Sequence, residues 1–154
     1  MDKSHYTIVF TPDTWQVFLA LENKSIGFRR SLINVVGKVR PGDVLICYLA
    51  KAMTWCAALK VVGSVYEEKS HVYTADHGFP LLLEVEPLVL LATSQQIPIK
   101  SPKLWDRLER FRKIDYQRNG WAVPAGLLCS LRRISEQDAR TLIVAMQGAS
   151  RKKQ

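Results

Sequence analysis

A turn followed by an uninterrupted apolar run sets the first constraint on the fold. Residues 39–50 read VRPGDVLICYLA. Pro41 fixes φ for the turn, Gly42 accepts backbone angles that other residues avoid, and Asp43 can hydrogen-bond to its local backbone. The run that follows is rich in β-branched and aromatic residues. We therefore expect a buried strand at 44–49.

Other apolar runs bounded by turn signals predict further strands at residues 6–10, 55–67 and 80–91. The short link AKAM joins the runs at 44–49 and 55–67, which makes an antiparallel hairpin their simplest pairing. Gly63 inside the second run indicates a bulge or a bend. The pattern predicts a mixed α/β fold with a mostly antiparallel sheet.

Short helices are expected between and after the strands. Thr11 suits an N-cap because a proline follows it, and Trp15 and Phe18 then recur at helical spacing as core residues. A second short helix is predicted at 30–37, another in KLWDRLERFRK, and Ser135 opens the last one.

The size and composition are those of one globular domain. The chain has 154 residues, of which 47% are hydrophobic and 23% charged. We expect a single domain over 1–154, with a core at about 5–146 and a basic tail at 147–154. The sequence contains neither a signal-peptide pattern nor a membrane-length apolar run, so we expect a cytoplasmic protein with no membrane partner.

Sequence motifs for catalysis are missing. There is no GxSxG, no glycine-rich phosphate loop and no HExxH, and the three cysteines have no CxxC spacing. We therefore expect no metal, no cofactor and no enzyme activity. A small-molecule or hydrolytic enzyme would need a nucleophile and a base in one cleft, and no sequence pair supplies them.

The charge indicates a polyanionic partner. The chain has 22 Lys and Arg against 14 Asp and Glu, a formal net charge of +8. Residues 100–133 contain nine basic and three acidic side chains, whereas residues 70–99 contain no Lys or Arg. Such asymmetry favours one basic face and a nucleic-acid partner.

The order of these pieces resembles the EVE domain of the PUA-like superfamily, over about residues 5–146. The segments that carry the resemblance are GFRR, VRPGDVLICY, VVGSVYE and LCSLRRISEQDARTL. The resemblance implies a PUA-like β-pseudobarrel of mostly antiparallel strands flanked by short helices. It also implies a non-catalytic reader that flips a modified base, most often 5-methylcytosine or a related cytosine in DNA, into an aromatic pocket.

The resemblance leaves the partner open between two classes of nucleic acid. Modified DNA is the first expectation, with a separate nuclease of a restriction or defence system as a further partner. The alternative is a PUA-like RNA-binding protein that reads modified or structured RNA, since the sister YTH domains read N6-methyladenine in RNA. Competition between modified DNA and matched RNA would discriminate the two.

Site residues follow from the resemblance. Tyr48 is expected to stack on the base with Phe28 or Phe79 opposite, and Ile26 stands where many family members have Trp. The expected base pocket comprises Phe10, Thr11, Ser25, Ile26, Gly27, Phe28, Tyr48, Trp55, Tyr73 and Phe79. The expected phosphate contacts are Arg29, Arg30, Lys51, Arg118, Arg132 and Arg133.

Overall fold

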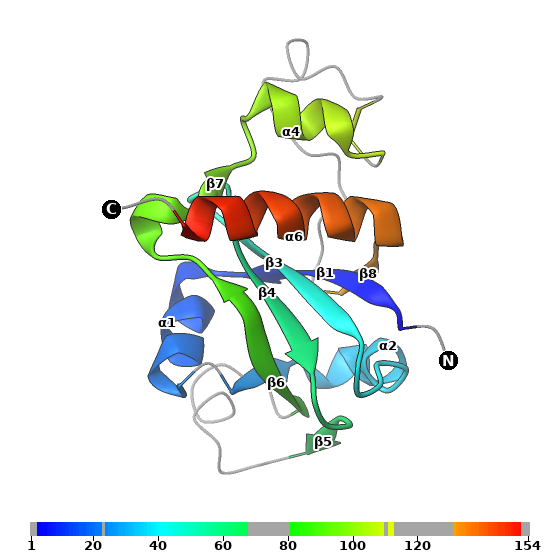
Figure 1. The fold of residues 1–154 in the computed structure, drawn as a ribbon. Coiled ribbons are helices and arrows are strands. Elements are labelled where there is room, and N and C mark those ends of the chain that lie inside the picture. Colours follow the sequence, from blue (N-terminus) through cyan, green and yellow to red (C-terminus); the bar gives the residue numbers. More distant parts are fainter. Residues whose placement is uncertain (1–2, 23, 68–80, 110, 113–130, 152–154) are drawn as a thin grey trace.

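The structure is a computed structural model that describes residues 3–22, 24–67, 81–109, 111–112 and 131–151. Its centre is a curled sheet of mostly antiparallel strands, with helices packed on both faces (Figure 1). The predicted mixed α/β fold is confirmed. The strands are β1 (His5–Phe10), β2 (Ser25–Phe28), β3 (Val44–Leu49), β4 (Thr54–Val61), β5 (Tyr66–Glu67), β6 (Leu81–Leu90), β7 (Ile97–Pro98) and β8 (Arg132–Arg133).

The strand order along the sheet is β2-β6-β4-β3-β1-β8, with β5 beside β6 and β7 beside β4. β1 and β3 run parallel, and the other described pairs are antiparallel. The predicted β3–β4 hairpin is confirmed. The run expected at 55–67 forms two strands, because the chain bends at Gly63 between β4 and β5.

Capping chemistry sets where the longer helices begin. Helix α1 (Pro12–Ala20) starts at the predicted N-cap, Thr11. Helix α6 (Glu136–Ser150) starts at Ser135, whose hydroxyl accepts from the Asp138 amide at 3.1 Å. The helix predicted at 30–37 is formed by η1 (Arg30–Leu32) and α2 (Ile33–Val36). The helix predicted at 103–113 is shorter than expected, because α4 (Pro102–Arg107) ends where the backbone of Leu108 becomes extended. A further turn is η2 (Thr93–Gln95).

Helix α6 extends further than the sequence suggested. It continues through Ser150, so the tail predicted at 147–154 is helical in its first four residues. Apolar residues at Leu142 and Met146 are fully buried, which keeps this helix on the sheet up to its last turn. Within the described part of the chain, no helix combines the length and the apolar character needed to cross a membrane.

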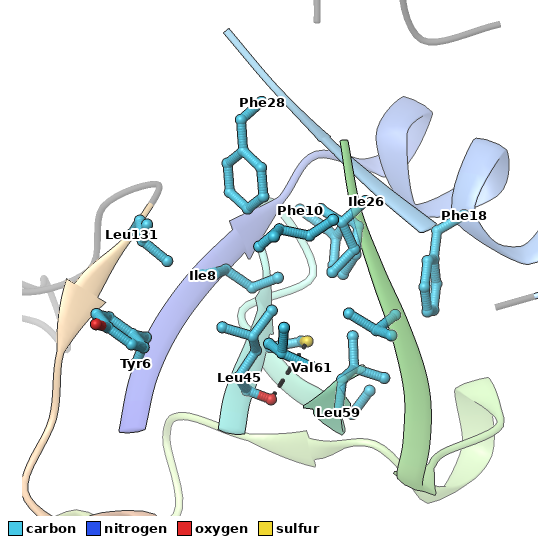
Figure 2. Close-up of a cluster of buried hydrophobic side chains, with 14 of the residues drawn as sticks. Tyr6, Ile8, Phe10, Phe18, Ile26, Phe28, Leu45, Leu59, Val61 and Leu131 are labelled. Atoms are coloured by element: carbon cyan, nitrogen blue, oxygen red, sulfur yellow. Dashed lines mark hydrogen bonds between the residues drawn. The ribbon is translucent and has the colours of Figure 1, made fainter. Parts of the chain in front are cut away.

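Alternation of side chains along the strands gives the sheet two apolar cores. One face packs against β2, α1 and α2, and we call it the α1 face. The other packs against α4 and α6, and we call it the α6 face. Figure 2 shows part of the α1 face, where side chains of β1 and β3 meet those of β2 and α1. The predicted core residues Trp15 and Phe18 belong to this face.

Candidate functional site

A cavity lies where the curled sheet fails to close. β1 and β2 approach each other on the α1 face, yet β1 pairs with β3 and β8, β2 pairs with β6, and the two share no ladder with one another. The gap between them, which we call the seam, encloses a cavity of about 140 Å³. Its lining comes from β1, α1, β2 and η1: Ile8, Val9, Phe10, Thr11, Thr14, Ile26, Gly27, Phe28, Arg29 and Leu32.

The walls of the seam are apolar and held by the core. Phe10, Ile26 and Phe28 are each less than 5% exposed. In Figure 2 these three side chains lie together on the same side of β1. The Phe10 ring packs edge-on against Trp15, with 5.2 Å between ring centroids, and it lies equally close to Phe18. Such packing fixes the Phe10 rotamer, so this wall is preformed.

Polar atoms enter the seam at the first turn of α1. The Thr14 amide donates to the Thr11 hydroxyl at 3.1 Å, and the Thr11 amide donates to the Thr14 hydroxyl at 2.9 Å. This reciprocal capping box satisfies the amides at the start of α1 and fixes both side chains. The Thr14 hydroxyl also donates to the Thr11 carbonyl at 3.2 Å and lies 3.1 Å from the Thr11 hydroxyl, so the capacity that remains for a ligand is to accept a hydrogen bond. The seam therefore combines an apolar wall with two positioned hydroxyl groups.

Two arginines follow β2 directly, and they have different surroundings. Arg29 is exposed and lines the seam. Arg30 forms an exposed ion pair with Glu67 of β5, which reaches it across β6. Arg29 is the better placed of the two to meet a charged ligand at the seam, because it lines the cavity and Arg30 does not.

Tyr48 and Trp55 lie on the other side of the sheet. Both belong to the α6 face, where their rings pack edge to face with centroids 5.4 Å apart. Burial raises the pKa of the Tyr48 hydroxyl. The expectation that Tyr48 faces Phe28 across one pocket is therefore wrong, because successive residues of a strand point to opposite faces and β3 presents Cys47 and Leu49 toward the α1 face.

The remaining predicted site residues lie away from the seam or outside the described residues. Ser25 begins β2 but does not line the cavity. Lys51 is exposed in the β3–β4 turn. Arg132 and Arg133 are exposed on the edge strand β8. Tyr73, Phe79 and Arg118 lie outside the described residues.

Sequence reasoning missed four residues that line the seam, namely Ile8, Val9, Thr14 and Leu32. Thr14 carried a readable signal, because a hydroxyl three residues after an N-cap threonine can complete a capping box. Ile8 and Val9 sit inside a predicted strand. Their position beside β2 depends on the curl of the whole sheet, which no local pattern encodes.

The described cysteines are structural. Cys47 and Cys56 are fully buried, and burial raises the pKa of both thiols. A raised pKa keeps a thiol protonated and unreactive. Among the described residues, no group of three or more His, Cys, Asp or Glu side chains could hold a metal ion. Cys129 lies outside the described residues.

Comparisons by sequence find no relatives. No protein-family model matches the chain, and no curated protein matches it. Membership of the EVE family therefore stays a prediction.

Comparisons by structure are informative about the fold. The YTH domain of the Zygosaccharomyces rouxii MRB1 protein in complex with N6-methyladenosine RNA matches with a TM-score of 0.63 and 8% identity, over 95% of this chain and 88% of that one. The Mmi1 YTH domain matches with a TM-score of 0.62 and 7% identity, over 96% and 97%. A hypothetical protein from Leishmania major has a TM-score of 0.62 and 13% identity, over 97% and 98%. The chain therefore shares its fold with YTH domains.

Proposed function

We propose that the chain is a non-catalytic module that holds one unstacked, modified base of an RNA strand in the seam. The observation that carries this proposal is the seam itself, a cavity of about 140 Å³ with apolar walls and two fixed hydroxyls. An apolar protein cavity of about 150 Å³ accommodates a benzene ring. The seam thus has room for a six-membered aromatic ring, with any further part of a base or sugar lying toward its mouth.

The chemistry of the walls suits the flat face of a base. Phe28 offers an aromatic surface, and Ile26 offers an apolar one. Stacking on an aromatic side chain offsets the free energy lost when a base leaves its stack. A methyl group on the base gains from an apolar wall, whereas the Thr11 and Thr14 hydroxyls can hydrogen-bond to the polar edge of the ring.

RNA is favoured over DNA as the partner by the comparisons in fold, because one matching YTH domain is in complex with N6-methyladenosine RNA. Single-stranded RNA also presents splayed bases, so a small pocket reaches them without opening a duplex. The +8 net charge supports attraction to either nucleic acid. Binding to 5-methylcytosine in DNA, a nuclease partner and a cytoplasmic location remain predictions from the sequence.

The test is fluorescence anisotropy with four oligonucleotides of matched sequence at fixed salt. These are RNA with and without N6-methyladenosine, and DNA with and without 5-methylcytosine. We expect the tightest binding to modified RNA. Equal binding of modified and unmodified strands would overturn the reader function, and a preference for methylated DNA would restore the first expectation from the sequence.

A cavity-filling variant ties any such preference to the seam. Leu32 is partly buried and lines the cavity, so Leu32→Phe should narrow it and reduce the preference for the modified strand. Val144→Phe is the matched control, because Val144 is 56% exposed on α6. An unchanged preference in Leu32→Phe would place the base elsewhere.

A further inference from the structure

A second polar cavity lies at the opposite end of β1 from the seam. It has a volume of about 110 Å³ and is lined by Lys3, His5, Glu136, Arg140 and Ile143. His5 is only 7% exposed, yet no described residue hydrogen-bonds to its imidazole. A buried polar group without a partner is unfavourable. The imidazole therefore lacks a partner that a ligand in this cavity would supply.

The charges around the cavity favour an anion. Lys3 and Arg140 are exposed cations at its rim, and the cavity lies along the side of helix α6, where Glu136, Arg140 and Ile143 line it over the first two turns. Glu136 is the opposing group, and Arg140 holds its carboxylate at 3.0 Å. We propose that this cavity binds a phosphate group, with Lys3, His5 and Arg140 as its donors.

The source of the phosphate follows from the position of the cavity, and this step rests on the proposed function. Phe10 follows His5 by five positions along β1, which corresponds to about 17 Å. The exposed Arg132 and Arg133 lie on β8 beside β1 in this interval. The seam lies on the α1 face and this cavity lies against α6, so a strand that joins a base in the seam to a phosphate at His5 has to pass around the β8 edge of the sheet and spans more than the distance along β1. We infer that the phosphate is part of the same RNA.

Binding of an anion should be coupled to protonation of His5. Burial lowers the pKa of His5, and so do the nearby Lys3 and Arg140, whereas Glu136 and Asp43 act in the opposite direction. A bound anion stabilises the imidazolium form and raises this pKa. The complex therefore takes up a proton, and affinity should increase as pH falls from 8 toward 5.5.

The first experiment measures the site without RNA. The ring protons of His5 are followed by NMR in the full chain during titration with inorganic phosphate, and with sulfate, which does not titrate in this pH range. We expect a saturable shift and a raised pKa of His5 with either anion. The absence of a saturable shift would overturn the site.

Charge variants supply the specificity control. Lys3→Ala should weaken sulfate binding about two- to fivefold, and Glu136→Gln should strengthen it by a similar factor, since each changes one solvent-screened charge at the rim. Arg151→Ala, at the far end of α6, removes a cation without touching the cavity and should leave binding unchanged. Equal weakening in Lys3→Ala and Arg151→Ala, or no gain in Glu136→Gln, would overturn the proposal.

The length of the oligonucleotide tests whether the bound phosphate belongs to the same RNA as the base in the seam. Lys3→Ala should weaken binding of a twelve-nucleotide RNA but not of a trinucleotide that carries the same modified base, because only the longer strand reaches His5. An equal effect on both lengths, or no effect on the longer RNA while sulfate still binds, would overturn the RNA source. If neither RNA binds while sulfate does, the proposed function fails and the phosphate site stands.

Discussion

Each of the two faces of the sheet has an apolar core, but the faces differ in how they are closed. On the α6 face, Trp55, Trp105 and Phe111 are each about 1% exposed and pack against one another under α6. On the α1 face, β2 approaches β1 without pairing, and a cavity remains between Phe10 and Phe28. Burial of an aromatic residue therefore does not by itself place it at a cavity, whereas two strands that approach without pairing leave a cavity between them here.

The largest expected effect is a loss of stability from a substitution on the α6 face. Trp55→Ala removes a ring that contacts Tyr48 and Phe111, so we expect the free energy of unfolding to fall by about 3–5 kcal/mol. Urea denaturation measures this change. Trp55→Phe is the milder variant, and it should retain the binding preference of the parent. A loss below about 1 kcal/mol in Trp55→Ala would mean that the α6 face is not a packed core.

The next largest effect is a loss of affinity for RNA from a substitution in the seam. Phe28→Leu keeps an apolar wall but removes the aromatic surface, so affinity for the modified RNA should fall by about 1–3 kcal/mol. Anisotropy titration measures the loss, and thermal melting checks that the variant is folded. Unchanged affinity in a folded Phe28→Leu would exclude stacking on this ring.

A smaller effect is expected from the arginines after β2. Removing one phosphate contact to a single strand should reduce the slope of log affinity against log salt concentration by about 0.7 in magnitude. We expect this change for Arg29→Ala and a smaller one for Arg30→Ala, because Arg29 lines the seam and Arg30 does not. A larger change in slope for Arg30→Ala than for Arg29→Ala would assign the phosphate contact to Arg30.

The smallest expected effect on affinity comes from Tyr48→Leu, which is the matched substitution to Phe28→Leu on the α6 face. Tyr48→Leu makes the same kind of change at a ring that is 8% exposed under the α6 side of the sheet. We expect affinity for the modified RNA to change by less than about 0.5 kcal/mol, whereas a base stacked on Tyr48 would lose about 1–3 kcal/mol. Titration beside Phe28→Leu decides between these values.

Local patterns were sufficient for most of the fold. The RPGD turn, the threonine and serine N-caps and the apolar runs predicted β1, β3, β6 and α1 to within a few residues, together with the starts of β4 and α6, because turn chemistry and capping act over three or four positions. The break at Gly63 was indicated as a bend. The end of α6 was not predicted, because the helix continues to Ser150 through packing of the preceding turns on the sheet.

The site was predictable only in part. The residues Phe10, Thr11, Ile26, Gly27 and Phe28 were expected in the base pocket and line the seam, and so does Arg29, which was expected as a phosphate contact. Tyr48 and Trp55 were assigned to the base pocket because aromatic residues at strand ends suit stacking. Which face such a residue occupies depends on the register of the hairpin and on the bulge between Cys47 and Tyr48, and neither can be read from composition.

NMR mapping with a trinucleotide that carries N6-methyladenosine tests the central claim most directly, because so short an RNA reports on the base site alone. The seam predicts the largest amide shifts at Thr11, Thr14, Gly27 and Phe28, with small shifts at Tyr48 and Trp55. The largest shifts at Tyr48, Trp55 and the residues of α6, with the seam unperturbed, would contradict the assignment of the seam as the base-binding site.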